Sequence, residues 1–216
     1  MPPRIAAGGY HTLALKSDGI LWAWGKNDFG QLGDDTNIHK NTPVQVGNDT
    51  KWVSMAAGSE HTLALKSDGT LWAWGRNDFG PLGDDTNIHK NTPVQIGDNT
   101  NWVSIATGNY HSLALRSDGT LWAWGKNDFG QLGDGTNTHK NTPAQIGNDT
   151  KWVSITGGSC HTIALKSDGT LWAWGYNRYG QRGVSTSLKL SYTSPYGRAK
   201  VISSWWGRLS PNPSRV

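Results

Sequence analysis

A period of 50 residues organises this chain and limits the folds that are open to it. The segment His-Thr-Leu-Ala-Leu-Lys-Ser-Asp-Gly starts at His11, His61 and His161, and a variant with Ser and Arg starts at His111. Residues 1–50 match residues 51–100 at 37 positions, without an insertion or deletion. Repeats of this length with a strand-like pattern are typical of β-propeller blades, because helical repeats would show an apolar period of about 3.6 residues.

Each repeat divides into four short strands. In the second repeat we predict strands at residues 52–56, 61–65, 70–74 and 93–96, each bounded by Gly, Asn, Asp or Pro. The Lys-Ser-Asp-Gly segment at residues 66–69 predicts a tight hairpin, since Gly accepts the positive φ that such a turn requires. The predicted fold class is therefore all-β, with propeller blades of four antiparallel strands.

The composition indicates how such blades would pack. The 216 residues include 28 Gly and 13 Trp, and only 35% of them are hydrophobic, which disfavours both a Leu-rich helical bundle and a disordered chain. Side chains alternate along a strand, so Trp72 and Trp74 share one face of their blade, with Leu71 and Ala73 on the other. We predict that the indole face of one blade packs on the small-residue face of the next. This assigns a structural role, rather than ligand stacking, to Trp24, Trp74, Trp124 and Trp174.

Three repeated segments resemble the regulator of chromosome condensation repeat: Gly-x-x-His-(Thr/Ser)-Leu-Ala-Leu, Ser-Asp-Gly-Thr-Leu-Trp-Ala-Trp-Gly and Asn-Asp-Phe-Gly-Gln-Leu-Gly-Asp. The resemblance covers residues 5–183, and the wording of the second segment is similar to bacterial members. A strand that closes on Trp-Gly separates this pattern from the Trp-Asp repeat, and the double glycine of kelch repeats is not periodic here. The resemblance implies a β-propeller whose best-known members close a ring of seven blades.

The array of repeats is incomplete at both ends. It occupies residues 1–183, divided into 1–50, 51–100, 101–150 and the partial repeat 151–183, which gives about four of the seven blades that the resemblance implies. Residues 1–4 stand where later repeats have the Trp-Val-Ser strand. After Gly183, residues 184–216 form a basic tail that shows no periodicity.

Two origins stay open for this tail. One is a frame-shifted continuation of the array, since Tyr192-Thr193-Ser194 read one base later can encode Thr-Pro-Val, and residues 205–207 then contain Gly-Gly. The other is a native cap or a disordered extension, because terminal repeats are often atypical. Resequencing the gene separates the two.

Charge also divides the chain at this boundary. Residues 1–183 carry 15 Lys and Arg against 16 Asp and Glu, a net charge of −1, and the tail carries five basic residues and no acidic one. Phosphate binding requires clustered cations, so we expect no nucleic-acid binding through the repeats. The longest apolar runs are far shorter than a membrane helix, so no membrane association is expected. Without a signal peptide the default location is cytoplasmic, and secretion stays open for a chain truncated at its N-terminus.

The candidate chemical groups repeat once per blade. His11, His61, His111 and His161 follow a glycine, and a second set lies in Asn-x-His-Lys-Asn. Without a nucleophile beside any one of them, we predict structural histidines bonded across their own blades, with a ring of metal ligands as the alternative.

Other catalytic and metal signatures are missing from the sequence. Cys160 is the only cysteine, which excludes an internal disulfide framework and a Cys-cluster zinc site. The Asp-rich loop at residues 33–37 offers oxygen atoms, but it lacks the spacing of a calcium loop and reads equally as a tight turn. No phosphate-binding Gly-x-x-x-x-Gly-Lys segment occurs. We therefore expect no enzyme, no cofactor and no metal.

Candidate binding residues lie where the repeats differ. Positions 9 and 10 of the repeat read Gly-Tyr, Ser-Glu, Asn-Tyr and Ser-Cys among uniform neighbours, which suggests exposed residues. Loops at the same end of successive blades lie on one face, and the Asn-Asp-Phe segments form a second protruding set with aromatic anchors. The alternative is neutral drift at solvated turns. The candidate loop-face residues are Tyr10, Glu60, Tyr110, Asp28, Phe29, Asp78, Phe79, Asp128 and Phe129.

These features predict a non-enzymatic scaffold that binds another protein, of unknown identity, through one loop face. The resemblance implies a second candidate, guanine-nucleotide exchange on a small GTPase, which is the activity of the family's namesake. Glycan binding is a third candidate if the indoles face outward. An open array also exposes the apolar faces of its terminal blades, which predicts self-association.

Overall fold

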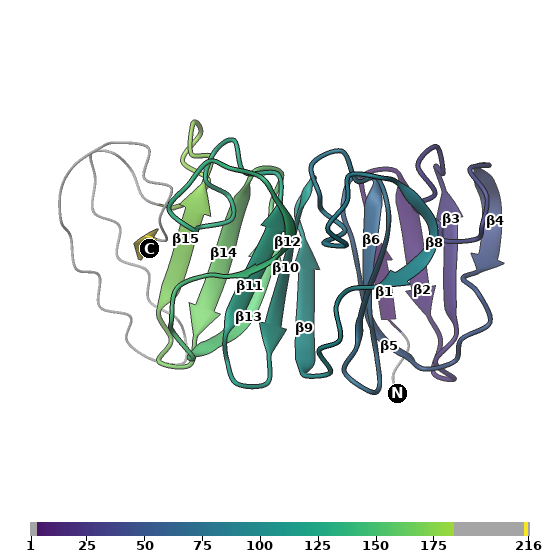
Figure 1. The fold of residues 1–216 in the computed structure, drawn as a ribbon, viewed down its shortest axis with the longest axis horizontal. Helices are drawn as coiled ribbons and strands as arrows, with labels where there is room; N and C mark the ends of the chain where they lie inside the picture. The colour runs from purple at the N-terminus through teal and green to yellow at the C-terminus, as the bar shows by residue number, and fades with distance from the viewer. Residues whose placement is uncertain (1–3, 184–213, 216) are drawn as a thin grey trace.

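The protein is a row of four separate antiparallel sheets, shown in Figure 1 along the long axis of the molecule. The computed structural model describes residues 4–183 and 214–215, and these residues contain strands and turns but no helix. The first and last blades lie at opposite ends of the row (Figure 1). The prediction of an all-β fold with four propeller blades in an open array is confirmed.

Each of the first three sheets uses four strands that are consecutive in the chain. The first blade consists of β1 (Arg4–Ala7), β2 (His11–Leu15), β3 (Leu21–Gly25) and β4 (Lys40–Gln45). The second consists of β5 (Trp52–Ala57), β6 (His61–Lys66), β7 (Leu71–Gly75) and β8 (Lys90–Gln95). The third consists of β9 (Trp102–Thr107), β10 (His111–Arg116), β11 (Leu121–Gly125) and β12 (Lys140–Gln145).

The fourth blade contains β13 (Trp152–Gly157), β14 (His161–Lys166) and β15 (Leu171–Gly175). Its fourth strand is β16 (Ser214–Arg215), which pairs antiparallel with β15 and comes from the end of the tail (Figure 1). The remaining tail residues, including the segments 192–194 and 205–207 on which the frame-shift hypothesis rests, lie outside the described residues. The boundary at residue 183 and the origin of the tail stay predictions.

The strands predicted for the second repeat agree with β5 to β8 except at the start of the last one. β8 begins at Lys90, before the expected residue 93, because Lys90 pairs with Gly75 beyond an irregularity in the register. The predicted hairpin at residues 66–69 is confirmed. The amide of Gly69 donates to the carbonyl of Lys66 at 3.0 Å, and Gly69 has a φ of 79°.

The hydrophobic core lies between the blades rather than within one. In the first interface, Trp74 of β7 is fully buried against Leu13, Leu21 and Ala23 of the first blade. The next two interfaces repeat this arrangement around Trp124 and around Trp174, both fully buried. The predicted packing of indoles on alanine and leucine is confirmed for these three interfaces.

Each buried indole also bonds across its interface. The Nε1 of Trp74 donates to the carbonyl of Gln31 at 3.0 Å, that of Trp124 to Pro81 at 2.8 Å and that of Trp174 to Gln131 at 2.9 Å. Each of these three buried indole N–H groups therefore has a hydrogen-bond partner, as buried polar groups in a stable core require. Trp24 differs from these three, because no described blade packs on its indole, which is only half-buried.

A tight turn after the third strand of each blade reaches over the next blade. In the second blade this turn contains Gly80, whose φ is 76° and whose missing Cβ would lie 2.5 Å from the Cα of Asn141. A side chain fits neither this backbone conformation nor this contact. The turn therefore requires glycine because of the neighbouring blade as well as because of its own φ.

Gly80→Ala tests this contact against a matched glycine. Gly147 has a similar φ of 63°, but nothing lies within 4 Å of the position of a Cβ there. Gly80→Ala and Gly147→Ala should each lower the free energy of unfolding by about 1–2 kcal/mol, because alanine disfavours the left-handed backbone. Only Gly80→Ala adds about 1–3 kcal/mol of steric strain. Urea denaturation should therefore show the larger loss for Gly80→Ala, and equal losses would contradict the contact.

Candidate protein-binding surface

The two predicted sets of loop residues lie at one end of the blades. Position 10 comes directly before the second strand and position 26 directly after the third, and a backbone bond joins the two positions in every blade. The amide of Lys26 donates to the carbonyl of Tyr10 at 2.8 Å, and Arg76 and Glu60 repeat the bond at 2.8 Å. We call the residues at repeat positions 10, 26, 28 and 29 of the four blades the loop rim.

Aromatic rings and cations alternate along this loop rim. The Arg76 guanidinium lies 4.7 Å from the ring centroid of Phe29 and 5.3 Å from that of Tyr110. The Nζ of Lys126 lies 4.6 Å from the Phe79 centroid, and the Phe79 and Tyr110 rings meet edge to face at 5.7 Å. The predicted aromatic residues of neighbouring blades thus form one row, linked by cation–π contacts.

The row is exposed to different degrees along its length. Tyr10 is 64% exposed and Phe129 is 40% exposed, while Phe29, Phe79 and Tyr110 are half-buried against their neighbours. The exposed acids of the row are Asp28, Asp78 and Asp128. The structure therefore brings the candidate aromatic and acidic residues together on one accessible edge, with Glu60 as the exception.

Glu60 is buried, contrary to the expectation that position 10 is exposed throughout. Its side chain accepts from the Nζ of Lys26 at 2.6 Å and from the Nη1 of Arg76 at 2.7 Å. Burial by itself would raise the pKa of Glu60, but these two hydrogen bonds outweigh it and hold the pKa below its usual range. Variation at repeat position 10 reflects different internal partners. A Tyr at this position contacts neighbouring rings and cations, whereas the Glu60 carboxylate bridges two blades.

Sequence reasoning missed the loop-rim cations at position 26, which are Lys26, Arg76 and Lys126. Each follows the Trp-Gly that closes a third strand, and the fourth blade has Tyr176 there. This position changes between Lys, Arg and Tyr while it keeps a Phe of the preceding blade as its partner, as Tyr176 does with Phe129 at 4.8 Å. Variation at position 26 was therefore the available signal.

The Asn-Asp-Phe segments protrude only in part. Asn27 is fully buried, because its Nδ2 donates to the Oδ1 of Asp34 at 3.0 Å and its Oδ1 accepts from the amide of Leu32 at 2.9 Å. Its amide donates to the Nδ1 of His39 at 3.0 Å. Asn27 thus shapes the loop from inside, and the same contacts recur at Asn77 and Asn127.

The carboxylate oxygens of Asp34, in the loop considered above as a calcium site, already have partners within the loop or its blade. The Oδ1 of Asp34 accepts from Asn27 and from both the amide and the hydroxyl of Thr36, and its Oδ2 lies 3.3 Å from the Nζ of Lys40. Among the described residues, no three His, Cys, Asp or Glu side chains are grouped as a metal site would need. The Asp-rich loop is therefore a self-bonded turn.

The two histidine positions have different roles. His39, His89 and His139 bond within their own blades, as expected. The expectation is wrong for the other set, which bonds to the following blade: the Nε2 of His61 lies 3.1 Å from the hydroxyl of Ser112, and His11 and His111 reach Thr62 and Thr162. The reason is that this histidine sits at the edge of the interface, where the next blade supplies the hydroxyl.

Burial keeps these interface histidines neutral. Loss of solvation, together with charge repulsion from His11 and His111, lowers the pKa of His61 to about 3. Burial likewise lowers the pKa of His111 to about 3 and that of His11 to about 4. A histidine that stays neutral and bonded between blades acts as a structural group.

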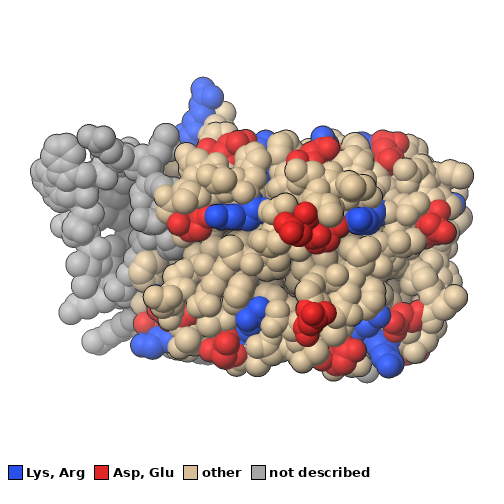
Figure 2. Space-filling model, in the orientation of Figure 1, with Lys and Arg blue, Asp and Glu red and all other residues tan. Residues whose placement is uncertain are grey.

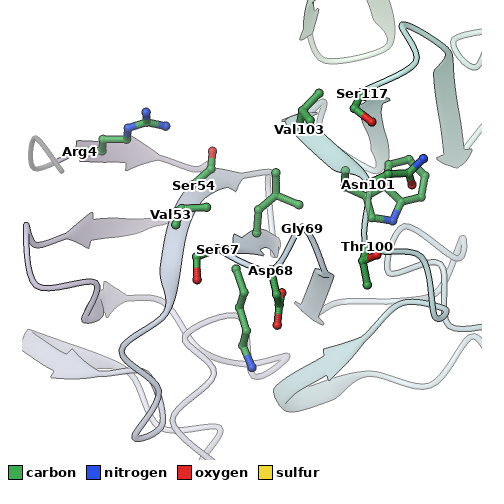
Figure 3. Close-up of a pocket in the computed structure, with 13 residues that line it drawn as sticks. Arg4, Val53, Ser54, Ser67, Asp68, Gly69, Thr100, Asn101, Val103 and Ser117 are labelled. Atoms are coloured by element: carbon green, nitrogen blue, oxygen red, sulfur yellow. The ribbon is translucent and has the colours of Figure 1, made fainter.

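A shallow polar groove of about 500 Å³ lies between the second and third blades, away from the loop rim. Figure 3 shows Ser67, Asp68 and Gly69 of the second blade on one side and Thr100, Asn101 and Val103 on the other. Asp68 is engaged in its own turn, where its Oδ1 accepts from Thr70. The groove therefore brings together no catalytic group of side chains.

Charges of both signs are mixed on the surface of the blades. Figure 2 shows acidic and basic side chains interspersed on one face, with neither sign gathered into a single patch. In the first three blades the loop-rim cation at position 26 lies beside an acid, as for Lys126 and Asp128 at 3.3 Å. Within the described part of the chain, no helix is long and apolar enough to cross a membrane.

Comparisons with solved structures support the same architecture. The chain superimposes on human WBSCR16 with a TM-score of 0.79 and 24% identity, over 99% of this chain and 52% of that one. It superimposes on Prp20p from Saccharomyces cerevisiae with a TM-score of 0.78 and 30% identity, over 98% of this chain and 49% of that one. The chain thus spans about half the length of these proteins.

Sequence relatives match over single repeats. The ultraviolet-B receptor UVR8 of Arabidopsis thaliana is 51% identical over 43 residues, which are 20% of this chain and 10% of the receptor. The guanine nucleotide exchange factor SRM1 of Saccharomyces cerevisiae is 53% identical over 36 residues, which are 17% of this chain and 8% of that protein. The family model of the RCC1-like domain matches residues 3–205. With this match and the four open blades, the chain belongs to the RCC1-like domain family.

Proposed function

We propose that this chain binds another protein through the loop rim and does not catalyse a reaction itself. The observation that carries the proposal is the row in which Lys26 lies by the rings of Tyr10 and Phe29, and Arg76 by those of Phe29 and Tyr110. The packed rings of Phe129 and Tyr176 belong to the same edge in the last two blades. Residues from four successive repeats contribute to this row. A contact surface of this kind is available to a partner that spans several blades.

The composition of the loop rim suits a protein partner. Exposed aromatic rings supply apolar contact area with little loss of side-chain freedom, and rings of this type are enriched among residues that dominate binding energy. The neighbouring carboxylates and cations supply orientation and selectivity rather than bulk affinity. Because the three cations at position 26 are each paired with an acid, the first three blades of the loop rim favour a mixed-charge protein surface over a polyanion.

The relatives support a protein partner as well. One solved structure is of yeast RCC1 (Prp20) bound to Kap60, and another concerns the binding of Prp20p to Gsp1p and histones. This chain is 29% and 30% identical to these proteins and spans about half of each. Gsp1p, Kap60 and histones are therefore the first probes to use.

A variant of the loop rim tests the proposal. Replacing Asp78, Asp128 and Phe129 by Ala removes three exposed side chains and one ring contact between blades, that of Phe129 with Tyr176. We expect this variant to weaken probe binding at least tenfold, about 1.4 kcal/mol. The matched control replaces the exposed Lys51 and Lys151, outside the loop rim, by Ala. Titration calorimetry against each probe gives the affinities, and equal binding by both variants would contradict a role for the loop rim.

Nucleotide exchange on a small GTPase is the second candidate. The specific observation in its favour is the segment that is 53% identical to the exchange factor SRM1. Release of a labelled guanine nucleotide from Gsp1p, with and without this chain, tests it. Acceleration would make exchange the function, whereas binding without acceleration leaves the scaffold.

Glycan binding has lost the observation on which it depended. It required indoles that face outward, and those of Trp74, Trp124 and Trp174 are fully buried between blades. Trp52, Trp102 and Trp152 are at most 5% exposed. A Lys or Arg side chain lies over each of the half-buried indoles of Trp22, Trp72, Trp122 and Trp172. We therefore do not carry glycan binding further for the described residues.

A further inference from the structure

The first blade has an open hollow at the loop rim in a place that the next two blades have filled. It measures about 620 Å³ and is lined by Tyr10, Gly25, Lys26, His39, Lys40 and Asn41. The corresponding residues of the second and third blades are covered by the turn of the preceding blade. These two filled copies show what fits the hollow.

In the second blade, the site equivalent to this hollow, which we call the seat, holds the turn Phe29-Gly30-Gln31 of the first blade. The Phe29 ring meets the His89 ring edge to face at 5.0 Å and lies under the Arg76 guanidinium at 4.7 Å. Gly30 passes directly against the backbone of Asn91, where a Cβ would collide. The Cα of Gln31 lies 3.2 Å from the position of a Cβ on Gly75.

The third blade repeats each of these contacts with the turn of the second. The Phe79 ring meets His139 at 5.3 Å and lies 4.6 Å from the Nζ of Lys126. Gly80 passes 2.5 Å from the Cα of Asn141, measured from the position of its missing Cβ. The seat therefore has four defining members: a glycine, a cation, a histidine and an asparagine.

The hollow of the first blade has the same four members. Gly25, Lys26, His39 and Asn41 occupy the positions of Gly75, Arg76, His89 and Asn91, one repeat earlier. No turn of another described blade lies on them, because the three turns that are engaged all cover the blade that follows in the chain. The first blade thus offers an unfilled seat for an aromatic-glycine turn.

The matching turn lies at the other end of the described array. Tyr179 is 80% exposed, and no described residue lies within 4 Å of the position of a Cβ on Gly180, whose φ is 77°. The turn is already formed, since the amide of Tyr179 donates to the Oε1 of Gln181 at 2.9 Å, as that of Phe29 does to Gln31 at 3.0 Å. Its conformation is therefore the one that docks in the filled seats.

We propose that the Tyr179-Gly180-Gln181 turn of one copy docks in the first-blade hollow of a second copy. The contact is head-to-tail, with two different surfaces, and it would also cover the half-buried Trp24 of the second copy. One residue differs from the internal interfaces: Arg182 stands where Leu32 and Leu82 are buried. A guanidinium stacks favourably on an indole, so Arg182 suits Trp24 as its neighbour. The proposal does not depend on the partner proposed above.

Two blocking variants test the two surfaces separately. Asn41→Trp fills the seat at the point where the glycine must approach, and Tyr179→Ala removes the ring. Thr42→Trp, also exposed on β4, and Tyr179→Phe, which keeps the ring found in the filled seats, are the matched controls. Multi-angle light scattering of the full chain over a range of concentrations gives the mass, and thermal unfolding checks that each variant is folded.

We expect the unmodified chain and both controls to exceed the monomer mass as concentration rises, with association at least tenfold weaker in Asn41→Trp and Tyr179→Ala. Mixing the two blocking variants should restore a dimer and nothing larger, because one retains a good turn and the other a good seat. A monomer at all concentrations, association unchanged in both blocking variants, or no dimer in the mixture would overturn the proposal. Loss of probe binding by the loop-rim variant with unchanged mass would leave this proposal intact.

Discussion

Trp124→Ala will lower the free energy of unfolding by about 3–5 kcal/mol, which is the range for removing a fully buried tryptophan. The indole of Trp124 fills the interface between the second and third blades, and its Nε1 donates to the carbonyl of Pro81 at 2.8 Å. Alanine leaves a cavity there and removes one of the two donors to the Pro81 carbonyl, which keeps the Ser112 hydroxyl at 2.6 Å. The loss is expected to affect the second and third blades together, since neighbouring repeats stabilise each other through their interfaces.

Trp24→Ala provides the matched control, because Trp24 occupies the same position of the repeat but no described blade packs on its indole. Its indole is half-buried and has no carbonyl across an interface, so we expect a loss of about 1 kcal/mol, typical of a less buried site. Urea denaturation followed by tryptophan fluorescence and circular dichroism gives both values at low protein concentration. Similar losses for the two variants would show that the interfaces between blades are not the source of stability.

Acidification from pH 6.5 to 4.5 will destabilise the protein through its interface histidines. Burial lowers the pKa of His61 and of His111 to about 3 in the folded chain, from the ordinary value of 6.5. Between these values the unfolded chain binds protons that the folded chain does not, so the free energy of unfolding falls as the pH falls. The slope from each such histidine rises from about 0.7 kcal/mol per pH unit at pH 6.5 to about 1.4 below pH 5.5.

His61→Gln separates this effect from other titrations. Without this histidine the unfolded chain binds one proton fewer, while the folded chain binds the same number. The slope of the free energy of unfolding between pH 5.5 and 4.5 should therefore decrease by about 1.4 kcal/mol per pH unit. Unfolding curves at each pH give the slopes, and an unchanged slope in His61→Gln would mean that this buried histidine is not the cause.

The blades and their core were predictable because they depend on local patterns. The Asp-Gly at residues 68–69 defines the hairpin, and the alternation of Trp72, Ala73 and Trp74 places indoles on a single face. A repeat without insertions then requires each blade to present the same two faces to its neighbours. These features need only the period of a strand and the φ of a turn.

The candidate site was predictable only in part. The sequence indicated that Tyr10, Phe29 and their copies belong to loops at one end of the blades, and the structure places them in one row. It did not indicate that Glu60 is buried or that Lys26 and Arg76 hold it from two different blades. Repeat-to-repeat variation shows that a position is not fixed, but it does not distinguish solvent from an internal partner.

The sequence by itself thus determined the strands, the turns and the indole faces of this protein, since each follows from residues a few positions apart. Only the tertiary structure decided which side chains meet across the blades, such as His61 with Ser112 or the Phe29 turn with its seat on the second blade. The physical reason is that these partners lie a whole repeat apart, and their distance depends on how far each blade turns and slides on the next. The packed interface determines this rotation and translation between blades, and the 50-residue period of the sequence does not specify them.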